Sequence, residues 1–294
     1  MNPDHPAGWS FSFPGEAPER LDLALIRGPV ELSRREARRR IDAGLVTING
    51  RPVSVASRAV SPGDRLSILA PDFVVPIVAN ESGVVAVAKP SGIPTQPAAQ
   101  QGPPAASEIV ASMLRRERQP DELFIVHRLD TGTSGVLVFA RSRAAAATLS
   151  RIFASENPKK VYLSIVHGAV EEPVEIDLPI ARESASRFRA DPAGRPAVTL
   201  IRPLGRSSGF SLIEATLRSG RTHQIRVHLA SIGNPVAGDR KYGGGFRDNA
   251  VRPMLHAWLL ELPSFGTYVA PVPDDFARFA SAEELATFLP NAMQ

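Results

Sequence analysis

The sequence contains no cysteine among its 294 residues. Disulfide bonds and thiolate metal sites are therefore excluded, and the composition suits a reducing compartment. No apolar run approaches the roughly 18 residues that a membrane-spanning helix needs. Residues 1–15 also lack the basic region and apolar stretch of a signal peptide. We therefore expect a soluble, cytoplasmic protein without a membrane partner.

Patterns that identify several common enzymes are missing as well. The sequence has no glycine-rich phosphate loop with lysine, no dinucleotide-binding glycine fingerprint and no nucleophilic-serine elbow. Its six histidines are dispersed. His223 and His228 are five positions apart, a spacing that shares a face poorly in either a helix or a strand. The residues therefore give no signal for a bound metal or nucleotide.

Positive charge is concentrated near the N-terminus. Residues 20–70 contain ten arginines and five acidic residues, a net charge of +5, whereas the whole chain carries +4. The remaining residues therefore sum to about −1, by the difference between those two values. A compact basic segment joined to a nearly neutral body predicts a domain that docks onto a polyanion.

We expect this small domain, a helix followed by a hairpin, over residues 19–72, after a loose N-terminal tail over residues 1–18. The four residues from Ser33 to Glu36 form a capping box that begins a helix, and Gly44 is a natural end for it. Asn49-Gly50 is the strongest short signal for a hairpin turn.

Arginines dominate the helix that begins after Ser33. Runs of like charge are usually solvated faces. Few acidic residues are near enough in sequence to neutralise this run, so we favour phosphate binding. The four arginines expected to make the docking contacts are Arg34, Arg35, Arg38 and Arg39.

Residues 77–290 form the second expected domain. Strand and helix patterns are mixed there without regular alternation, which predicts an α+β fold with a mixed, largely antiparallel sheet flanked by helices and loops. The expected strands include residues 84–88, 136–140, 161–166 and 210–217, and the expected helices residues 109–116, 143–154 and a short one after Ser281. Residues 97–106 are rich in proline, glutamine and alanine and predict a mobile loop.

The most informative stretch runs from His127 to Gly135. Apolar runs on either side, residues 123–126 and 136–140, predict buried strands. A polar loop between buried strands is a good place to fix a reactive carboxylate such as Asp130. The same pattern also fits an ordinary turn that Asp130 caps and Arg128 neutralises.

Five motifs in order, between about residues 77 and 263, resemble the RluA-type pseudouridine synthases. They lie at residues 89–92, 127–135, 160–162, 220–244 and 255–257. The basic segment also resembles the small RNA-binding domain named after ribosomal protein S-four. That likeness lies in residues 20–22, the helix at 33–44 and residues 46–50.

The resemblance implies an isomerase that converts uridine to pseudouridine within RNA, without a cofactor or a metal. It implies that Asp130 is the catalytic carboxylate and that Tyr162 packs against the target uracil. It also implies that Arg128 fills the gap left when the target nucleotide leaves the stack. Whether Asp130 attacks the anomeric carbon or removes a sugar proton stays open.

An ionised aspartate is favoured by a nearby guanidinium, and we expect Arg221 to be that partner. Further substrate contacts are expected from His127, Thr133, Gln224 and Ile225. Without the resemblance, Tyr162 would be interpreted as core and Arg221 as a surface or phosphate-binding residue. The segment after Gly220 is helical by resemblance, although its apolar residues alternate as in a strand.

Two other functions stay open. An RNA-binding or ribosome-assembly factor would not need Asp130, Tyr162 and Arg221 together. A hydrolase of nucleosides or sugars usually needs two carboxylates, and the loop offers one. We expect RNA as the partner, with ribosomal RNA favoured over tRNA because several docking arginines suit a large folded RNA, and we expect a monomer.

Overall fold

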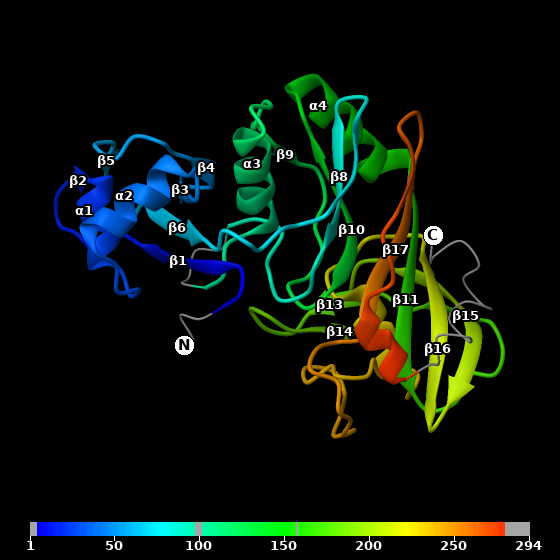
Figure 1. The fold of residues 1–294 in the computed structure, drawn as a ribbon. Helices are drawn as coiled ribbons and strands as arrows, with labels where there is room; N and C mark the ends of the chain where they lie inside the picture. Colours follow the sequence, from blue (N-terminus) through cyan, green and yellow to red (C-terminus); the bar gives the residue numbers. More distant parts are fainter. Residues whose placement is uncertain (1–4, 98–101, 157, 280–294) are drawn as a thin grey trace.

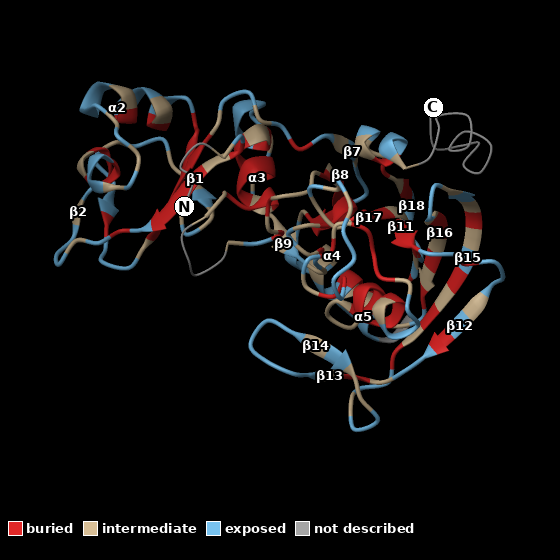
Figure 2. Cartoon of the chain, turned by 90° about the horizontal axis from the view of Figure 1, so that it is seen from below, coloured by how far each residue is buried: buried red, intermediate tan, exposed pale blue. Residues whose placement is uncertain are grey.

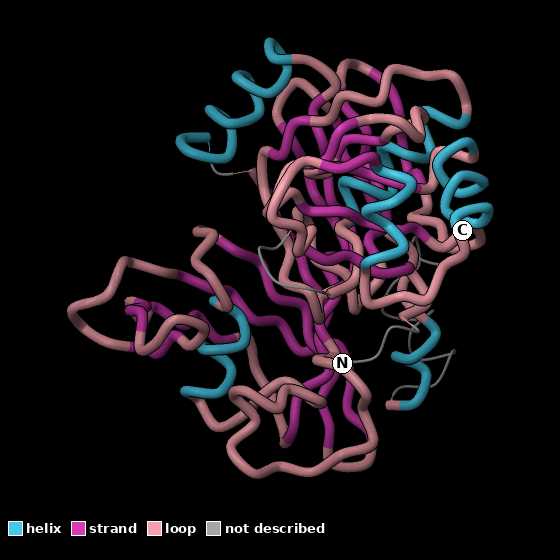
Figure 3. The backbone as a smooth tube through the Cα atoms, turned by 90° about the vertical axis from the view of Figure 1, so that its left-hand side faces the viewer, coloured by secondary structure: helices cyan, strands magenta, loops and turns pink. Residues whose placement is uncertain are grey.

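The computed structural model describes residues 5–97, 102–156 and 158–279. Two bodies are visible in Figure 1: a small N-terminal domain in blue and a larger domain from cyan to red, with α3 between them. The expected short helix after Ser281 lies outside the described residues. Strands predominate over helices throughout (Figure 3). No helix in the described ranges is long and apolar enough to cross a membrane.

The N-terminal domain is a four-stranded sheet covered by short helices. Its strands are arranged in the order β1-β6-β3-β4. Its elements are β1 (Gly8–Ser12), β2 (Glu19–Arg20), α1 (Leu21–Ala24), η1 (Leu25–Arg27), α2 (Arg34–Asp42), β3 (Val46–Ile48), β4 (Arg51–Pro52), β5 (Ala59–Val60) and β6 (Arg65–Leu69). The helix and the hairpin are both where the sequence predicts them.

The prediction of a loose tail over residues 1–18 is wrong for its described part. Strand β1 pairs antiparallel with β6 along its whole length. Trp9, Phe11 and Phe13 are buried in the core of the N-terminal domain. These three aromatic residues alternate with serines, and that period of two was the signal for a half-buried strand. Burial of their rings holds this segment in the sheet.

The hairpin signal acts as expected, and the serine half of the predicted capping box forms at the start of α2. Ser33 Oγ accepts the backbone N–H of Glu36 at 3.1 Å, which caps the first turn. The Glu36 carboxylate pairs with Arg39 and Arg40. Between β3 and β4, Asn49 and Gly50 have φ angles of 50° and 81°, the left-handed geometry that a tight hairpin turn requires.

The larger domain is built on a ten-stranded sheet in the described residues. Its main path is β12-β15-β16-β11-β17-β10-β8-β7, with β18 paired to β17 and β9 paired to β10. The strands are β7 (Ile77–Glu81), β8 (Val84–Lys89), β9 (Phe124–Ile125), β10 (Ser134–Ala140), β11 (Lys159–His167), β12 (Val174–Asp177), β15 (Val198–Ser207), β16 (Phe210–Leu217), β17 (Leu255–Leu262) and β18 (Gly266–Val269). All neighbours are antiparallel except β10 and β17, which run parallel. The predicted α+β class is confirmed.

Helices cover the sheet and a separate hairpin extends from it. They are α3 (Ala106–Arg116), α4 (Arg143–Arg151) with the π-helical turn η2 (Ile152–Glu156), α5 (Gln224–Ser231) and η3 (Asp274–Arg278). The hairpin consists of β13 (Ile180–Arg182) and β14 (Phe188–Ala190). Ser142 caps α4 by accepting from the N–H of Ala145. The segment after Gly220 is helical, as the resemblance implies, and α5 begins at Gln224.

One of the two strands predicted to flank the Asp130 loop is shorter and more exposed than expected. Only Phe124 and Ile125 form β9, and Ile125 is 39% exposed. Among the described strands β9 pairs with β10 alone, so its other edge lacks a neighbour there. In contrast, β10 is buried throughout, as predicted.

The two domains are joined through buried contacts on α3. The carboxylate of Glu108 accepts the hydroxyl of Thr47 at 2.7 Å and that of Ser67. Its second oxygen accepts the N–H of Ala105 at the start of α3. Ser112 donates to the carbonyl of Gly44. One buried cluster contains apolar side chains of both domains, among them Leu45 and Leu69 of the N-terminal domain and Ile109 and Leu114 of α3.

Candidate active site

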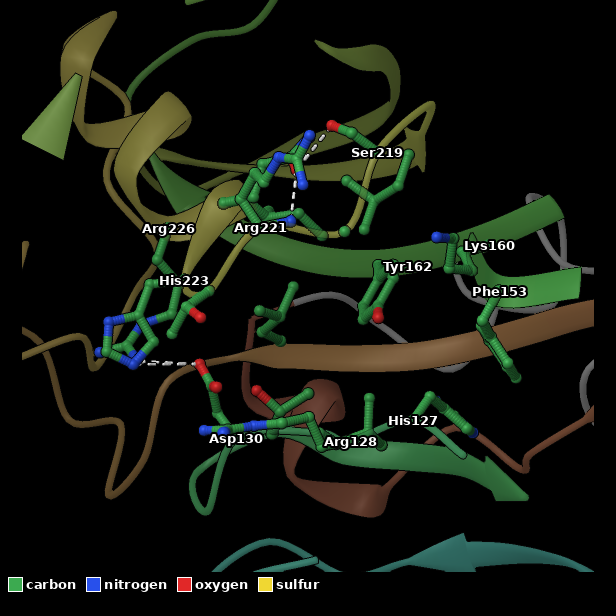
Figure 4. Close-up of a pocket in the computed structure, with 18 of the residues that line it drawn as sticks. His127, Arg128, Asp130, Phe153, Lys160, Tyr162, Ser219, Arg221, His223 and Arg226 are labelled. Atoms are coloured by element: carbon green, nitrogen blue, oxygen red, sulfur yellow. Dashed lines mark hydrogen bonds and ion pairs between the residues drawn. The ribbon is translucent and has the colours of Figure 1, made fainter. Parts of the chain in front are cut away.

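A cavity of about 630 Å³ opens between the loop before β10, strand β11 and the turn that leads into α5 (Figure 4). The structure brings together in its wall all eight residues that the sequence predicts as catalytic or substrate-binding. They are Asp130, Tyr162, Arg221, Arg128, His127, Thr133, Gln224 and Ile225. Within residues 5–97, 102–156 and 158–279, no three histidine, aspartate or glutamate side chains are placed to hold a metal ion together.

The loop that carries Asp130 is fastened to residues 89–95. Thr95 Oγ1 accepts from the N–H of Leu129 at 3.0 Å and donates to the carbonyl of Leu129 at 2.9 Å. Gly92 N–H donates to the Thr131 carbonyl at 2.8 Å, and Ser91 Oγ donates to the Gly132 carbonyl at 2.9 Å. These contacts fix the backbone on both sides of Asp130, so its carboxylate is presented from a rigid support.

Lys89 lies under the same loop and is almost fully buried. Its ammonium group donates to the carbonyls of Pro90 and Ile93, both at 2.9 Å. Burial lowers the pKa of Lys89 to about 7, although the charge of Asp130 opposes this shift.

At the end of the loop Gly135 has a φ of +120°. A side chain there would overlap the backbone of Ala257 on β17, so the parallel pairing requires glycine.

Arg226, not Arg221, holds Asp130. The Nη1 of Arg226 donates to Oδ2 of Asp130 at 3.2 Å, whereas Nε of Arg221 donates to the carbonyl of Pro196 at 3.0 Å. The predicted Asp130–Arg221 pair is therefore wrong. The physical reason is that α5 begins at Gln224, which places Arg226 in the first helical turn beside the loop and leaves Arg221 in the turn before it.

Asp239 fixes Arg226 from the other side. Its two oxygens accept from Nε and Nη2 of Arg226 at 2.6 and 2.8 Å, a bidentate pair. Burial alone would lower the pKa of Arg226, but Asp239 and Asp130 outweigh it and raise the pKa. The guanidinium is therefore charged and held in one orientation. Sequence reasoning gave neither residue a role, although both lie within the motif at residues 220–244.

The two carboxylate oxygens of Asp130 have different surroundings. Oδ2 is contacted by Arg226 and lies 3.5 Å from Nε2 of His223. In the described parts of the chain, Oδ1 has no hydrogen-bond partner, and the side chain is 20% exposed. Asp130 therefore keeps one oxygen available to a molecule in the cavity. Among the described residues its side chain accepts no backbone N–H of the turn, so the alternative in which Asp130 caps the turn is wrong.

Tyr162 enters the cavity from β11 at a break in strand register. The pairing of β11 with β17 shifts between Val161 and Tyr162, and such bulges re-aim a side chain. Tyr162 packs against two apolar clusters, one that contains Leu163 and Leu255 and one that contains Leu129 and Ala257. Burial, together with the charge of Asp130, raises the pKa of Tyr162, so its hydroxyl keeps its proton. The neighbouring Lys160 also lines the cavity, and burial and Arg221 lower its pKa.

Two of the expected substrate contacts are occupied by the protein itself. His127 Nε2 accepts the N–H of Val138 at 2.9 Å, and its ring stacks on Phe153. Burial lowers the pKa of His127 to about 3, so the neutral ring anchors the start of the loop. These contacts make His127 part of the cavity wall.

Gln224 is occupied in the same way. Its amide oxygen accepts from Ser219 and from the N–H of Arg221, and its amide nitrogen donates to Val198 and Thr199. All of its hydrogen-bonding capacity is therefore used. Gln224 shapes the turn before α5, and the expectation that it binds substrate is wrong for this arrangement.

The predicted docking arginines are organised around a carboxylate that sequence reasoning overlooked. Asp22 on α1 is fully buried and accepts from Nε of Arg20, Arg34 and Arg38 at 3.0, 3.1 and 2.8 Å. The three arginine side chains are nonetheless 45–49% exposed. One negative charge thus gathers three positive ones at the surface. Arg39 pairs with Glu36, and Arg35 is exposed.

Comparison with known proteins points in one direction. The sequence pattern of the family described as RNA pseudouridylate synthase matches residues 83–231, and that of the S4 domain matches residues 19–66. The ribosomal large subunit pseudouridine synthase D of Haemophilus influenzae is 30% identical over 301 residues, which cover 92% of each chain. The protein of the same name from Nitrosomonas europaea is 40% identical over 173 residues, 54% of this chain and 50% of that one.

Solved structures agree with these relatives. The human RNA pseudouridylate synthase domain containing 1 superposes with a TM-score of 0.57 at 26% identity, over 75% of this chain and 96% of that one. The larger domain therefore has the fold of that protein. The matched range 83–231 contains Asp130, Tyr162 and Arg226, the residues that meet in the cavity.

Proposed function

The chain belongs to the family of RNA pseudouridylate synthases, isomerases that act on uridine in RNA, and from this premise we propose that it modifies large-subunit ribosomal RNA with Asp130 as its catalytic carboxylate. The observation that carries the mechanism is the asymmetry of Asp130. One oxygen is held by Arg226, and the other is open to the cavity.

Two findings support ribosomal RNA as the substrate. Relatives that align over most of this chain bear the name ribosomal large subunit pseudouridine synthase D. The N-terminal S4 domain carries the arginine cluster around Asp22 on its surface. Such a cluster suits the dense phosphates of a large folded RNA.

Within the cavity the reaction breaks two bonds and forms two. The bond between the ribose anomeric carbon and uracil N1 breaks, the uracil turns, and the same carbon bonds to uracil C5. The proton on C5 then leaves, and N1 gains one, so that the product is an isomer of the substrate. No outside oxidant, reductant or group donor is needed.

Asp130 supports this sequence through Oδ1. With Oδ2 held by Arg226, Oδ1 can attack the anomeric carbon or take a proton from the ribose. Either route requires the carboxylate beside the sugar. Tyr162 offers a ring against which a uracil stacks, and its protonated hydroxyl is a hydrogen-bond donor to the base. The detached uracil must be retained, which the enclosed wall of Tyr162, Ile225 and Leu217 favours.

The target nucleotide reaches the cavity only after it leaves its stack. Unstacking costs a few kcal/mol, which contacts to the flipped base and to the gap offset. Arg128 lines the cavity two residues before Asp130 and is exposed, and we propose that its side chain occupies that gap. Base flipping is therefore part of the proposal.

The test is pseudouridine mapping of ribosomal RNA and tRNA, by carbodiimide labelling and primer extension, in cells that lack the gene. The cells are then complemented with wild type or with Asp130→Asn. We expect specific stops to vanish from large-subunit RNA and to return only with wild type. Stops that vanish from tRNA alone would overturn the substrate. Stops restored by Asp130→Asn would overturn the role of the carboxylate, and an unchanged map would favour an RNA-binding factor without catalysis.

A further inference from the structure

A line of contacts leads from the β13–β14 hairpin to the catalytic carboxylate. The backbone N–H of Phe188, the first residue of β14, donates to Oη of Tyr242 at 3.0 Å. Oη of Tyr242 lies 2.7 Å from Nδ1 of His223. Nε2 of His223 lies 3.5 Å from Oδ2 of Asp130, the contact marked between these two residues in Figure 4.

The direction of the protons along this line follows from the chemistry of each group. The tyrosine oxygen accepts from Phe188 and has one proton of its own to donate, which points to Nδ1 of His223. If Nδ1 accepts, the proton of a neutral imidazole is on Nε2. The opposite tautomer would aim the Nε2 lone pair at a carboxylate oxygen, which is repulsive. Both ends of the ring therefore select the same form, with Nε2–H directed at Asp130.

The surroundings of His223 keep the imidazole neutral. Burial lowers the pKa of His223, Arg226 and Lys241 act in the same direction, and Asp130 and Asp239 oppose them. Burial also raises the pKa of Tyr242, so the phenol keeps the proton that it donates. The guanidinium of Arg187, from the hairpin, lies over the Tyr242 ring at 5.4 Å.

The backbone of His223 is held in an uncommon conformation. Its φ is +58° at the residue before α5, the left-handed region that residues other than glycine seldom occupy. Such strain persists where surrounding contacts fix it. Here the rings of Phe188 and Tyr242 both meet the imidazole edge to face at 5.5 Å. The conformation turns the ring toward Asp130.

From these contacts we propose that His223 is a positioning residue for the reaction. It donates from Nε2 to Oδ2 of Asp130, its tautomer is set by Tyr242, and through Phe188 it couples the carboxylate to the β13–β14 hairpin. This inference rests on the proposed function of Asp130. With Arg226 it gives Oδ2 two donors, which restrains rotation of the carboxylate and leaves Oδ1 without a partner among the described residues.

The hairpin is well placed to be the source of this coupling. It extends from the body beside α5 and is largely exposed (Figure 2). Residues 180–195 carry four arginines and two acidic residues, so the segment attracts RNA phosphates. An RNA that moves the hairpin moves the Phe188 amide, and with it the hydrogen bond that sets the histidine.

The test compares full-length variants in single-turnover conversion of an RNA that wild type modifies, across RNA concentration and between about pH 5 and pH 8. His223→Leu removes the donor, His223→Gln keeps an amide donor, and Tyr242→Phe removes the phenol proton. His228→Gln is the matched control, because His228 is a buried histidine on α5, the helix that follows His223, and it contacts Thr199 and Leu178 instead. Melting temperatures verify that each variant folds.

We expect His223→Leu to lower the maximal rate by about 100-fold, the cost of a misplaced reacting group, with the half-saturating RNA concentration within about twofold. His223→Gln should recover most of the rate, and Tyr242→Phe should lose about tenfold. Wild type should slow as acid protonates His223, and His223→Gln should lose that part of the pH profile. His228→Gln should keep the wild-type profile.

Three results would overturn the inference: a wild-type rate in His223→Leu, no rescue by glutamine, or a loss confined to RNA affinity. Asp130→Asn in the same series separates this outcome from failure of the proposed function. If that variant is inactive and His223→Leu is fully active, only the role of His223 fails. If Asp130→Asn is active, the proposed mechanism fails as well.

Discussion

Asp22 and Asp130, one in each domain, both contact arginines, but their surroundings differ. Asp22 in the N-terminal domain is fully buried, and its oxygens accept from three guanidinium groups. Asp130 is 20% exposed, and the one guanidinium that contacts it does so at a single oxygen. A carboxylate whose oxygens are both occupied organises its neighbours. One with a free oxygen on a cavity can act on a substrate.

The two sites also differ in how their arginines are exposed to solvent. Burial alone would raise the pKa of Asp22, but hydrogen bonds from Arg20, Arg38 and Arg34 outweigh it and hold the pKa well below its usual range. The outward nitrogens of those arginines remain at the surface. Around Asp130 the arginine is itself buried and anchored by Asp239, so little positive charge reaches solvent.

The largest expected effect is that of Asp130→Asn on turnover. Without a carboxylate neither attack nor proton removal is possible, and we expect the rate to fall by at least about 1,000-fold. Affinity for RNA should stay near that of wild type, because the docking surface is untouched. Release of tritium from RNA labelled at uracil C5 measures the rate, and filter binding measures the affinity. Appreciable product from the pure variant would contradict the assignment.

Replacing Arg226 or Arg221 with lysine tests which of the two arginines holds Asp130. Lysine keeps the charge but cannot make the bidentate bond to Asp239 while reaching Asp130. We expect Arg226→Lys to lower the maximal rate by about 100-fold and Arg221→Lys to lower it only a few-fold. The reverse order would show that Arg221 takes over as partner when RNA is bound. Single-turnover rates at saturating RNA give the answer.

Asp22→Asn should act on stability and docking and leave the chemistry alone. Loss of charge-assisted hydrogen bonds should lower the free energy of unfolding by about 1 to 3 kcal/mol at neutral pH. Because the folded-state pKa of Asp22 is depressed, this advantage of wild type is complete above the unfolded pKa of about 3.9 and fades as pH falls below it. Urea denaturation of both proteins at neutral and acidic pH measures the difference. A difference that does not change with pH would contradict the role of the charge.

The same variant separates two views of the arginine cluster. Simple counting of charge predicts tighter RNA binding, since one negative charge is lost. An organised cluster predicts weaker binding, since Arg20, Arg34 and Arg38 lose their common anchor. We expect weaker binding at every salt concentration, measured with the same RNA.

Arg35→Ala should have the smallest effect. Arg35 is exposed and has no ion pair with any residue in the described ranges. If it contacts one phosphate, the slope of log affinity against log salt should become shallower by about 0.7 to 0.9, with no change in melting temperature. An unchanged slope would remove Arg35 from the docking surface and leave the cluster around Asp22.

Local signals in the sequence were sufficient for much of the fold. Ser33 with Glu36, Asn49-Gly50 and the apolar run that forms β16 each act through neighbours in sequence, so their geometry follows from residue type. The strand at residues 8–12 was missed because its partner β6 lies more than fifty residues away and its alternating aromatics were overlooked beside the prolines. Pairing over such a distance is decided by the tertiary core.

For the site, motifs identified which residues meet but not how they pair. Asp130, Tyr162 and the turn before α5 were correctly brought together. The choice of Arg221 over Arg226 depended on where α5 begins, and the alternating pattern of Ile225, Val227 and Leu229 obscured that point. Asp22 and Asp239 were missed because a buried carboxylate is recognised by the guanidinium groups around it, which only the folded chain brings close.

The buried contacts of Glu108 with Thr47 and Ser67 have a consequence for how an RNA is chosen. A docking domain on a flexible tether would raise the local concentration of any RNA around the cavity, within the reach of the tether. Here buried contacts join the two domains, so the arginines around Asp22 and the oxygen of Asp130 are held at a fixed distance from each other. With the docking proposed for these arginines, an RNA gains from the first contact only if its uridine lies at that distance, so we expect the enzyme to select RNA by distance as well as by sequence.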